Sequence, residues 1–517
     1  MRAIVALSIS AALGGSNSAA QSRPPGDDAG KGIQLAAEGN WKAAEIELRK
    51  AMEQKPNEPR ILAALGTVLL QRQKTLEAVT YLEKAVEIAP ADVGIRLDLA
   101  KAEWQAGKLQ AAQSNLQMVL KHHPNDSKAI MLLGMVAERS GDFAEAAKLL
   151  RSVPLALRTE PLADAALASA CYHKGTSEQA RLCMAPIQNA SSKGIFMAAT
   201  AAADAGDFAT AEAMLLSIRP FYQDRYALDY QLALVQYHAG DIAASQATLT
   251  DMIAKREDSG DTHNLLGWCW FKRDNLNQAE QELNEAIRLD PSSETNYLDL
   301  ARMQLAGRQL DAALDSARLA VKLFPKSSEG WLVKGSIETL AQRLADALTS
   351  YTTAVRLDGN NAEAELALAN AQWLAGKTEQ ARASFHLLLQ RYPRTAQVYV
   401  AYADFLSNVG PRNPAQLRGL MTTALALDSS LAEPHYYLGN SALTNGKVDE
   451  AVQQLEIAAQ LDPASSKTHF ALSRALRQQG RREESERELG IYQELKAAEE
   501  GASRPGPTPL SDPAKEP

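Results

Sequence analysis

Apolar residues of fixed size recur along this chain with a period of 34 residues. Prolines separated by 34 residues, or by a multiple of 34, mark the period: Pro56, Pro90 and Pro124, and later Pro291, Pro325 and Pro393. When the proline is counted as position 32, Leu is usual at position 7, and small residues recur at positions 8, 20 and 27. The pattern predicts a two-helix hairpin whose apolar face is buried only by stacking on neighbouring hairpins.

Two further positions complete the repeat. Position 24 carries a bulky residue that would fill the space between the two helices: Leu48, Leu82, Leu116, Leu150, Leu283, Tyr351, Phe385 and Leu455. Position 15 carries a glycine in eight units: Gly39, Gly107, Gly141, Gly206, Gly240, Gly376, Gly446 and Gly480. Glycine readily adopts the left-handed conformation that ends a helix, so we expect the first helix to end there. The proline at position 32 ends the second helix.

This frame resembles the tetratricopeptide repeat family. The segment that ends at Pro291 carries Leu266, Gly267, Ala279 and Leu283 in register. About fourteen such units fit residues 25–499, and the resemblance implies an all-α protein, an α-solenoid wound as a right-handed superhelix. The length of 517 residues, which for an ordinary globular protein would suggest several domains, is then explained by one repeat array.

The units are not equally regular. We expect units 1–4 at residues 25–160, with 21–30 as linker and start of the first repeat, and units 8–11 at 260–395. Units 5–7, at 161–259, are degenerate, because Arg158, Gln223 and Glu257 replace the proline. A unit with an insertion near Pro411 follows at 396–431, units 13 and 14 cap the array at 432–499, and the proline-rich residues 500–517 are predicted to be disordered.

The N-terminus is typical of an exported protein. Arg2 precedes a short apolar stretch, and small residues at Ser18 and Ala20 fit a signal peptide over residues 1–20. The stretch is too short to span a bilayer, and we predict no integral membrane span. The protein is therefore expected to be periplasmic or secreted. The alternative is a frayed, Ala-rich terminus on a cytoplasmic chain.

Composition and motifs argue against several function classes. The net charge is −8 and no long Lys/Arg run occurs, so nucleic-acid binding is not expected. Gly376-Lys377-Thr378 resembles the end of a phosphate-binding loop, but Ala371 replaces the required glycine. The eight histidines form no metal-ligand spacing. We predict no cofactor, no metal and no catalytic site.

Cys171 and Cys183 occupy positions 11 and 23 of one unit, on facing helices of a single hairpin. In an exported protein they could form a disulfide if their α-carbons approach within about 7 Å. The alternative, which the sequence favours, is two small apolar residues buried inside the hairpin. Cys269 is left over as a single thiol.

The resemblance implies that positions 2, 5, 9, 12 and 13 of the first helices line a concave groove. Aromatic residues, which form only 6% of the chain, recur at such positions: Trp104, Tyr172, Phe196, Tyr230, Tyr237, Trp268, Phe271, Trp373, Tyr436 and Phe470. Tyr230, Tyr237, Trp268 and Phe271 lie in two consecutive units and form the predicted ligand surface. Aromatic side chains suit an apolar peptide side chain or a sugar ring. Packing between adjacent helices is the alternative role.

These observations favour a non-catalytic scaffold that binds a protein or peptide partner in its groove, in the cell envelope. A glycan ligand is also compatible with aromatic side chains. One alternative is a periplasmic assembly factor for envelope polysaccharide export. Another is the substrate-recognition arm of an enzyme complex. The sequence leaves the oligomeric state open.

Overall fold

The computed structural model describes residues 28–153, 160–174, 176–185, 187, 190–409 and 413–501. These residues form helices joined by short connections, without a strand among them, and the helices pair into fourteen hairpins. The predicted all-α solenoid of tetratricopeptide-type hairpins is thereby confirmed. The signal peptide predicted at 1–20, most of the 21–30 linker, Arg158, Pro411 and nearly all of the 500–517 tail lie outside the described residues.

The hairpins fall into two compact units, and the chain passes from the first to the second between Asp258 and Ser259. The first unit holds seven hairpins. They are α1 (Asp28–Ala37) with α2 (Trp41–Gln54), α3 (Pro59–Gln71) with α4 (Thr75–Ile88), α5 (Val93–Gln105) with α6 (Leu109–His122), α7 (Ser127–Arg139) with α8 (Phe143–Ser152), α10 (Pro161–Lys174) with α11 (Ser177–Cys183), α12 (Ser192–Asp204) with α13 (Phe208–Ile218), and α14 (Arg225–His238) with α15 (Ile242–Ala254).

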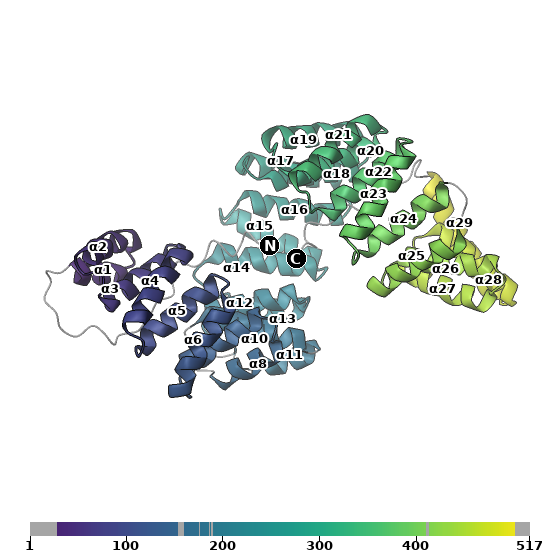
Figure 1. Ribbon diagram of the computed structural model, residues 1–517. Coiled ribbons are helices and arrows are strands. Elements are labelled where there is room, and N and C mark those ends of the chain that lie inside the picture. Colours follow the sequence, from purple (N-terminus) through teal and green to yellow (C-terminus); the bar gives the residue numbers. More distant parts are fainter. Residues whose placement is uncertain are drawn as a thin grey trace. The chain divides into compact units, whose positions relative to one another are not determined.

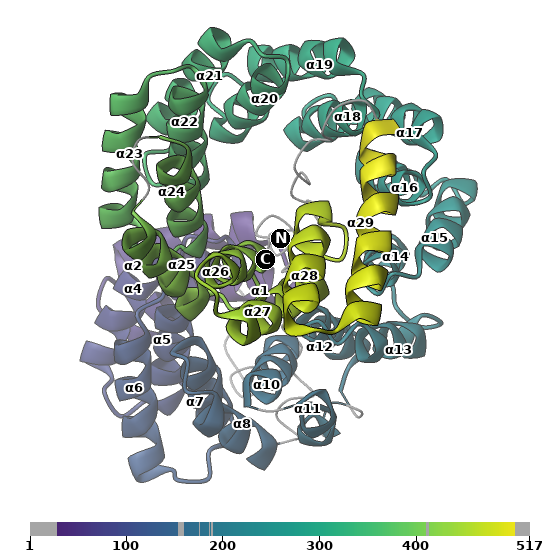
Figure 2. The same ribbon diagram turned by 90° about the vertical axis from the view of Figure 1, so that its right-hand side faces the viewer.

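The second unit also holds seven hairpins. They are α16 (Gly260–Lys272) with α17 (Leu276–Leu289), α18 (Glu294–Ala306) with α19 (Leu310–Leu323), α20 (Ser328–Leu340) with α21 (Leu344–Leu357), α22 (Ala362–Leu374) with α23 (Thr378–Arg391), α24 (Ala396–Asn408) with α25 (Pro414–Leu427), α26 (Ala432–Thr444) with α27 (Val448–Leu461), and α28 (Ser466–Gln479) with α29 (Arg482–Gly501). Within this unit the hairpins follow one another in chain order, from teal through green to yellow (Figures 1 and 2).

Short side chains start the helices at fixed places in the repeat. Two residues after the position-32 proline, the Asp126 carboxylate accepts a hydrogen bond of 2.8 Å from the Ala129 N–H and caps α7. Directly after the position-15 glycine, Asp241 accepts one of 2.9 Å from the Ala244 N–H and caps α15. Such caps satisfy N–H groups that have no partner inside the helix.

Contacts between positions 8 and 24 recur in the cores of the hairpins. Leu48, Leu82, Leu116, Leu150, Leu283 and Leu455 at position 24 are all 0% exposed. A Cβ on Gly66 would lie 2.6 Å from the Leu82 Cγ, and a Cβ on Gly439 would lie 2.6 Å from the Leu455 Cγ. The absence of a side chain at position 8 therefore admits the bulky residue of the facing helix. The structure confirms both predicted roles.

The left-handed turn at position 15 occurs with and without glycine. The eight predicted glycines have φ angles from 75° to 89°. The four hairpins in which another residue stands at this position make the same turn, with φ from 57° to 62° at Gln73, Asp274, Arg308 and Gln342. Residues that carry a Cβ adopt this conformation at a cost of about 1–2 kcal/mol. The repeat geometry therefore imposes the turn, even on side chains that disfavour it.

We expect Gln342→Gly to stabilise the α20–α21 hairpin by about 1 kcal/mol relative to Gln342→Ala, because only glycine relieves the strain at positive φ. Both substitutions remove the same exposed side chain, so alanine is the matched control. Hydrogen exchange of the α20 and α21 amides measures the difference. Equal protection in the two variants would show that the turn is not strained.

An unpartnered carboxylate is buried where α10 meets α12. Asp164 is 0% exposed, and neither of its oxygens has a hydrogen-bond partner. It lies against Gly194, in the first turn of α12, where a Cβ would collide with the Asp164 Oδ2. Burial, helped by the nearby Glu160, raises the pKa of Asp164 to about 7. The folded protein therefore favours the neutral acid.

This raised pKa predicts that the α10–α12 contact weakens as the pH rises. Between pH ~4, the pKa of an unfolded Asp, and pH ~7, the folded state binds more protons than the unfolded chain, so stability falls by up to about 1.4 kcal/mol per pH unit. Above pH ~7 the loss is complete. Asp164→Asn should abolish this dependence in hydrogen exchange of α10 and α12, whereas Glu53→Gln, at an exposed position of α2, should leave it unchanged. An unaltered slope in Asp164→Asn would contradict the assignment.

Candidate binding groove

A hollow of about 630 Å³ opens between three consecutive first helices of the second unit, α22, α24 and α26. We call it the groove hollow. Its lining residues come from these helices and their connections: Asn370, Trp373, Leu374, Gln397, Val400, Ala401, Asp404, Leu431, Ala432, Glu433, Pro434 and Asp462. Most of them stand at or next to the positions that the family resemblance assigns to the groove.

One side of the groove hollow is apolar. The Trp373 ring is partly exposed and meets the buried Phe405 ring edge to face, with centroids 5.9 Å apart. Leu374, beside it, is 54% exposed. The indole is thus packed against the core, while part of it remains exposed in the groove hollow. Trp373 is the predicted groove residue that lines the hollow.

The other side carries negative charge. Asp404 projects from α24, Glu433 from the first turn of α26, and Asp462 follows α27. Partial burial raises the pKa of Asp404, and the negative charge of Glu433 raises it further. One cation stands nearby, Lys467, whose Nζ lies 3.1 Å from the Glu433 Oε1.

Of the remaining predicted aromatics, Phe470 is 41% exposed, and Trp104, Tyr172, Phe196 and Tyr436 are partly buried. Lys467 lies over the Tyr436 ring, 5.0 Å from its centroid. The Trp104 Nε1 donates a hydrogen bond of 3.3 Å to the Met135 carbonyl. The Tyr172 hydroxyl donates one of 2.9 Å to Asp207. Trp104 and Tyr436 thus contact the next first helix, and Tyr172 contacts the N-cap of α13.

The predicted cluster of four aromatics is divided between the two units. Tyr230 and Tyr237 belong to α14 of the first unit, and Trp268 and Phe271 belong to α16 of the second. Tyr237 is 4% exposed and Trp268 is 7% exposed, so both take part in packing. Tyr230 and Phe271 are partly exposed. A joint ligand surface of these four residues stays a prediction.

A buried polar network, which the sequence did not reveal, lies beneath Trp268. The indole Nε1 donates to the Asp299 Oδ2 at 3.1 Å, and the Arg302 guanidinium reaches Asp299 at 3.1 Å and Glu329 at 2.6 Å. Burial raises the pKa of Asp299, which is 0% exposed. In the sequence, the only sign of this network is that Asp299 and Arg302, which have opposite charges, stand three residues apart on a first helix. The network links α16, α18 and α20.

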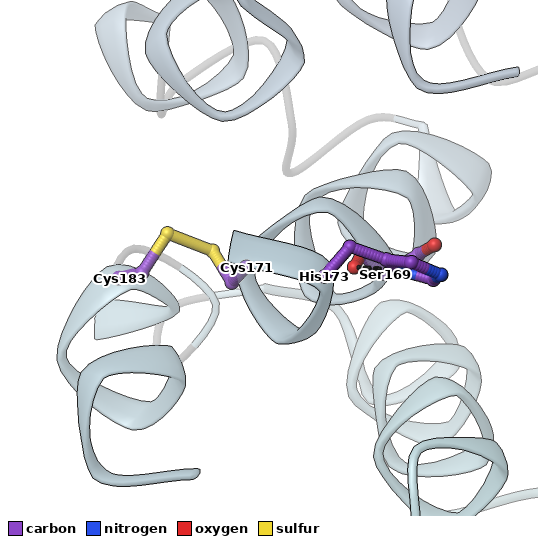
Figure 3. Close-up of a disulfide and its surroundings, with 4 residues drawn as sticks. All are labelled: Ser169, Cys171, His173 and Cys183. Atoms are coloured by element: carbon purple, nitrogen blue, oxygen red, sulfur yellow. Dashed lines mark hydrogen bonds between the residues drawn. A yellow bond between two sulfur atoms is a disulfide. The ribbon is translucent and has the colours of Figure 1, made fainter. Parts of the chain in front are cut away.

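A disulfide joins Cys171 on α10 to Cys183 at the end of α11, with α-carbons 5.8 Å apart (Figure 3). The sequence favoured two buried thiols, and the structure differs because the two helices bring these residues within bridging range. The crosslink closes a loop with a sequence separation of 12, for which about 3 kcal/mol of stabilisation is typical. Cys269 is buried and free.

Within the described ranges, no group of three or more His, Cys, Asp or Glu side chains is placed to hold a metal ion. None of the helices that the structure describes has both the length and the apolar character needed to cross a membrane.

The fold and the groove define an all-α solenoid of helical hairpins, a class whose extended surfaces bind other macromolecules. The chain belongs to the tetratricopeptide repeat family. The model for the TPR domain of cytochrome c-type biogenesis protein H matches residues 40–160, and three tetratricopeptide repeat models match 196–216, 230–294, 298–362, 363–395 and 436–497. Proteins of this family act as protein-interaction scaffolds.

Two curated proteins are similar over short segments. ALBINO3-like protein 2, chloroplastic, from Arabidopsis thaliana is 31% identical over 140 residues, covering 23% of this chain and 27% of that protein. Cellulose synthase operon protein C from Xanthomonas axonopodis pv. citri is 37% identical over 84 residues, covering 16% of this chain and 6% of that protein. The chain thus spans about a quarter or less of the relatives it matches.

Two solved structures align with most of the chain. The APC/C hetero-tetramer Cut9–Hcn1 has a TM-score of 0.38 and 14% identity, with coverage of 91% of this chain and 94% of the other. Yeast Tom70 has a TM-score of 0.40 and 18% identity, with coverage of 92% and 95%.

Proposed function

We propose that this protein is a non-catalytic scaffold of the cell envelope that holds a segment of a protein partner in the groove hollow. The observation that carries the proposal is the hollow itself. It lies on consecutive first helices of a tetratricopeptide array, and it joins an exposed apolar wall, Trp373 and Leu374, to a row of carboxylates. A few polar groups beside an apolar surface are typical of ligand sites.

Two independent features support the envelope location. The first twenty residues fit a signal peptide. The Cys171–Cys183 pair has a separation suited to a disulfide, and disulfides persist mainly in oxidising compartments such as the periplasm.

A periplasmic role in polysaccharide export is a second candidate. The similarity to cellulose synthase operon protein C favours it, although that similarity covers 16% of this chain. The model that matches residues 40–160 is named for cytochrome c-type biogenesis instead. The two names concern different processes. The primary proposal therefore rests on the groove hollow, and the identity of the crosslinked partner would indicate the process.

Site-specific crosslinking in living cells tests the scaffold. Gln397, exposed in the groove hollow, is replaced by the photo-crosslinking residue benzoylphenylalanine, and Leu387, which is 50% exposed on the second helix α23, is the matched control. We expect position 397 to give a discrete crosslinked protein that position 387 does not give, with its identity read by mass spectrometry. Crosslinking to glycan would favour the polysaccharide role. Equal products from both positions, or none, would contradict a groove-binding scaffold.

The envelope location predicts the thiol content and the N-terminus of protein taken from intact cells. Alkylation after unfolding without reductant should modify Cys269 alone, and reduction should add Cys171 and Cys183. The mature N-terminus should be Gln21, the residue after the predicted cleavage site. In Cys183→Ser, two thiols should react without reductant. Three reactive thiols in a chain that retains the N-terminal segment would place the protein in a reducing compartment.

A further inference from the structure

The groove hollow also indicates the charge of its partner. Position 9 of one hairpin faces position 2 of the next along the row of first helices. Arg302 at position 9 and Glu329 at position 2 show this contact directly, with a 2.6 Å ion pair. The repeat register thus brings these two positions close enough to form a salt bridge between neighbouring hairpins.

The same register in the groove hollow holds two carboxylates. Asp404 occupies position 9 on α24, and Glu433 occupies position 2 on α26. Glu433 contributes to raising the pKa of Asp404, as expected for facing like charges. At Arg302 and Glu329, positions 9 and 2 hold a cation and an anion. In the groove hollow, the same two positions hold two anions.

Lys467 forms a direct ion pair with only one of the two carboxylates, and its charge also acts on Asp404. Lys467 pairs with Glu433 at 3.1 Å and also lies over the Tyr436 ring. Asp404 accepts a hydrogen bond of 3.2 Å from the Asn408 side chain, and no Lys or Arg of the described ranges is ion-paired with it. A positive charge supplied from outside would therefore meet a carboxylate that has no direct ion pair.

The apolar part of the lining suits a planar cation. The partly exposed Trp373 ring offers an aromatic surface, and the apolar Leu374 and Val400 would contact a neighbouring aliphatic side chain. A guanidinium can stack on an indole while it donates two parallel hydrogen bonds to a carboxylate, whereas an ammonium acts as a point charge. A hollow that combines an aromatic ring, apolar side chains and carboxylates therefore favours an arginine over a lysine as the residue that it binds.

We infer that the groove hollow binds a peptide segment of the partner protein that presents an arginine beside an aliphatic residue, with Asp404 and Glu433 recognising the guanidinium and Trp373 stacking on it. This inference rests on the proposed scaffold function and adds the chemistry of the partner to it. The like-charge contact between Asp404 and Glu433 is relieved when the arginine binds.

Selection from a random 12-residue peptide library against the full mature protein tests the inference. We expect enrichment of peptides with arginine next to Leu, Ile or Val. Enrichment should disappear with Asp404→Asn and persist with Asp346→Asn, which removes an exposed carboxylate from the first turn of α21. Enriched peptides without a basic residue, unchanged enrichment in Asp404→Asn, or no enrichment at all would overturn the inference.

The affinity of the best peptide separates recognition from folding. Replacing its arginine by citrulline, which has nearly the same shape but no charge, should weaken binding at least tenfold to the native protein and less than threefold to Asp404→Asn. The thermal midpoint of Asp404→Asn should equal or exceed that of the native protein, because a repulsion has been removed. A lower midpoint with an equal citrulline effect in both proteins would show a structural role only.

The two proposals fail in different ways. A protein crosslinked from position 397, together with selected peptides that lack arginine, would keep the scaffold and discard the arginine preference. Failure of crosslinking together with failure of selection would discard both.

Discussion

The contact between position 8 and position 24 governs the architecture of this protein. Gly66 lies so close to Leu82 that a methyl group would collide with it, and Gly439 bears the same relation to Leu455. The contact holds two helices of each hairpin together, and its repetition every 34 residues leaves each hairpin with an outer face that the next one covers. Stability is therefore distributed over many local interfaces rather than gathered in one core.

Local stability has a consequence for the groove. A hairpin that is held by its own position-8 contact can vary the residues on its first helix without losing its fold. In the second unit the same register thus carries an ion pair at Arg302 and Glu329, and two facing carboxylates at Asp404 and Glu433. A binding surface can arise where substitutions on the first helices leave two like charges next to each other. The hairpin core remains intact and compensates for the electrostatic repulsion.

The repeat frame was predictable from sequence because it depends on residue size at fixed spacing. Leu48, Leu116 and Leu283 are fully buried as the pattern indicates, and the position-15 glycines turn as expected. The left-handed turn at Gln342 was not predictable from residue type, since glutamine does not favour positive φ; the tertiary register imposes it. Sequence also could not separate buried from exposed aromatics. Trp268 and Trp373 both occupy groove positions, yet only Trp268 is covered, because a partner for its N–H, Asp299, lies on the next first helix.

The two tryptophans show what makes a groove position available for binding. The Trp268 indole N–H donates to Asp299, which also accepts a hydrogen bond from Arg302, and the Trp268 ring is buried beside this network. Around Trp373 the ring is anchored by Phe405, and the nearest row of carboxylates contains Asp404, to which no described cation is paired. The Asp404 side chain is exposed to solvent, where a carboxylate without a paired cation carries little desolvation cost. The two groove positions therefore differ in the partner that the next first helix supplies: Asp299 accepts the indole N–H of the buried Trp268, whereas Trp373 stays partly exposed in the groove hollow.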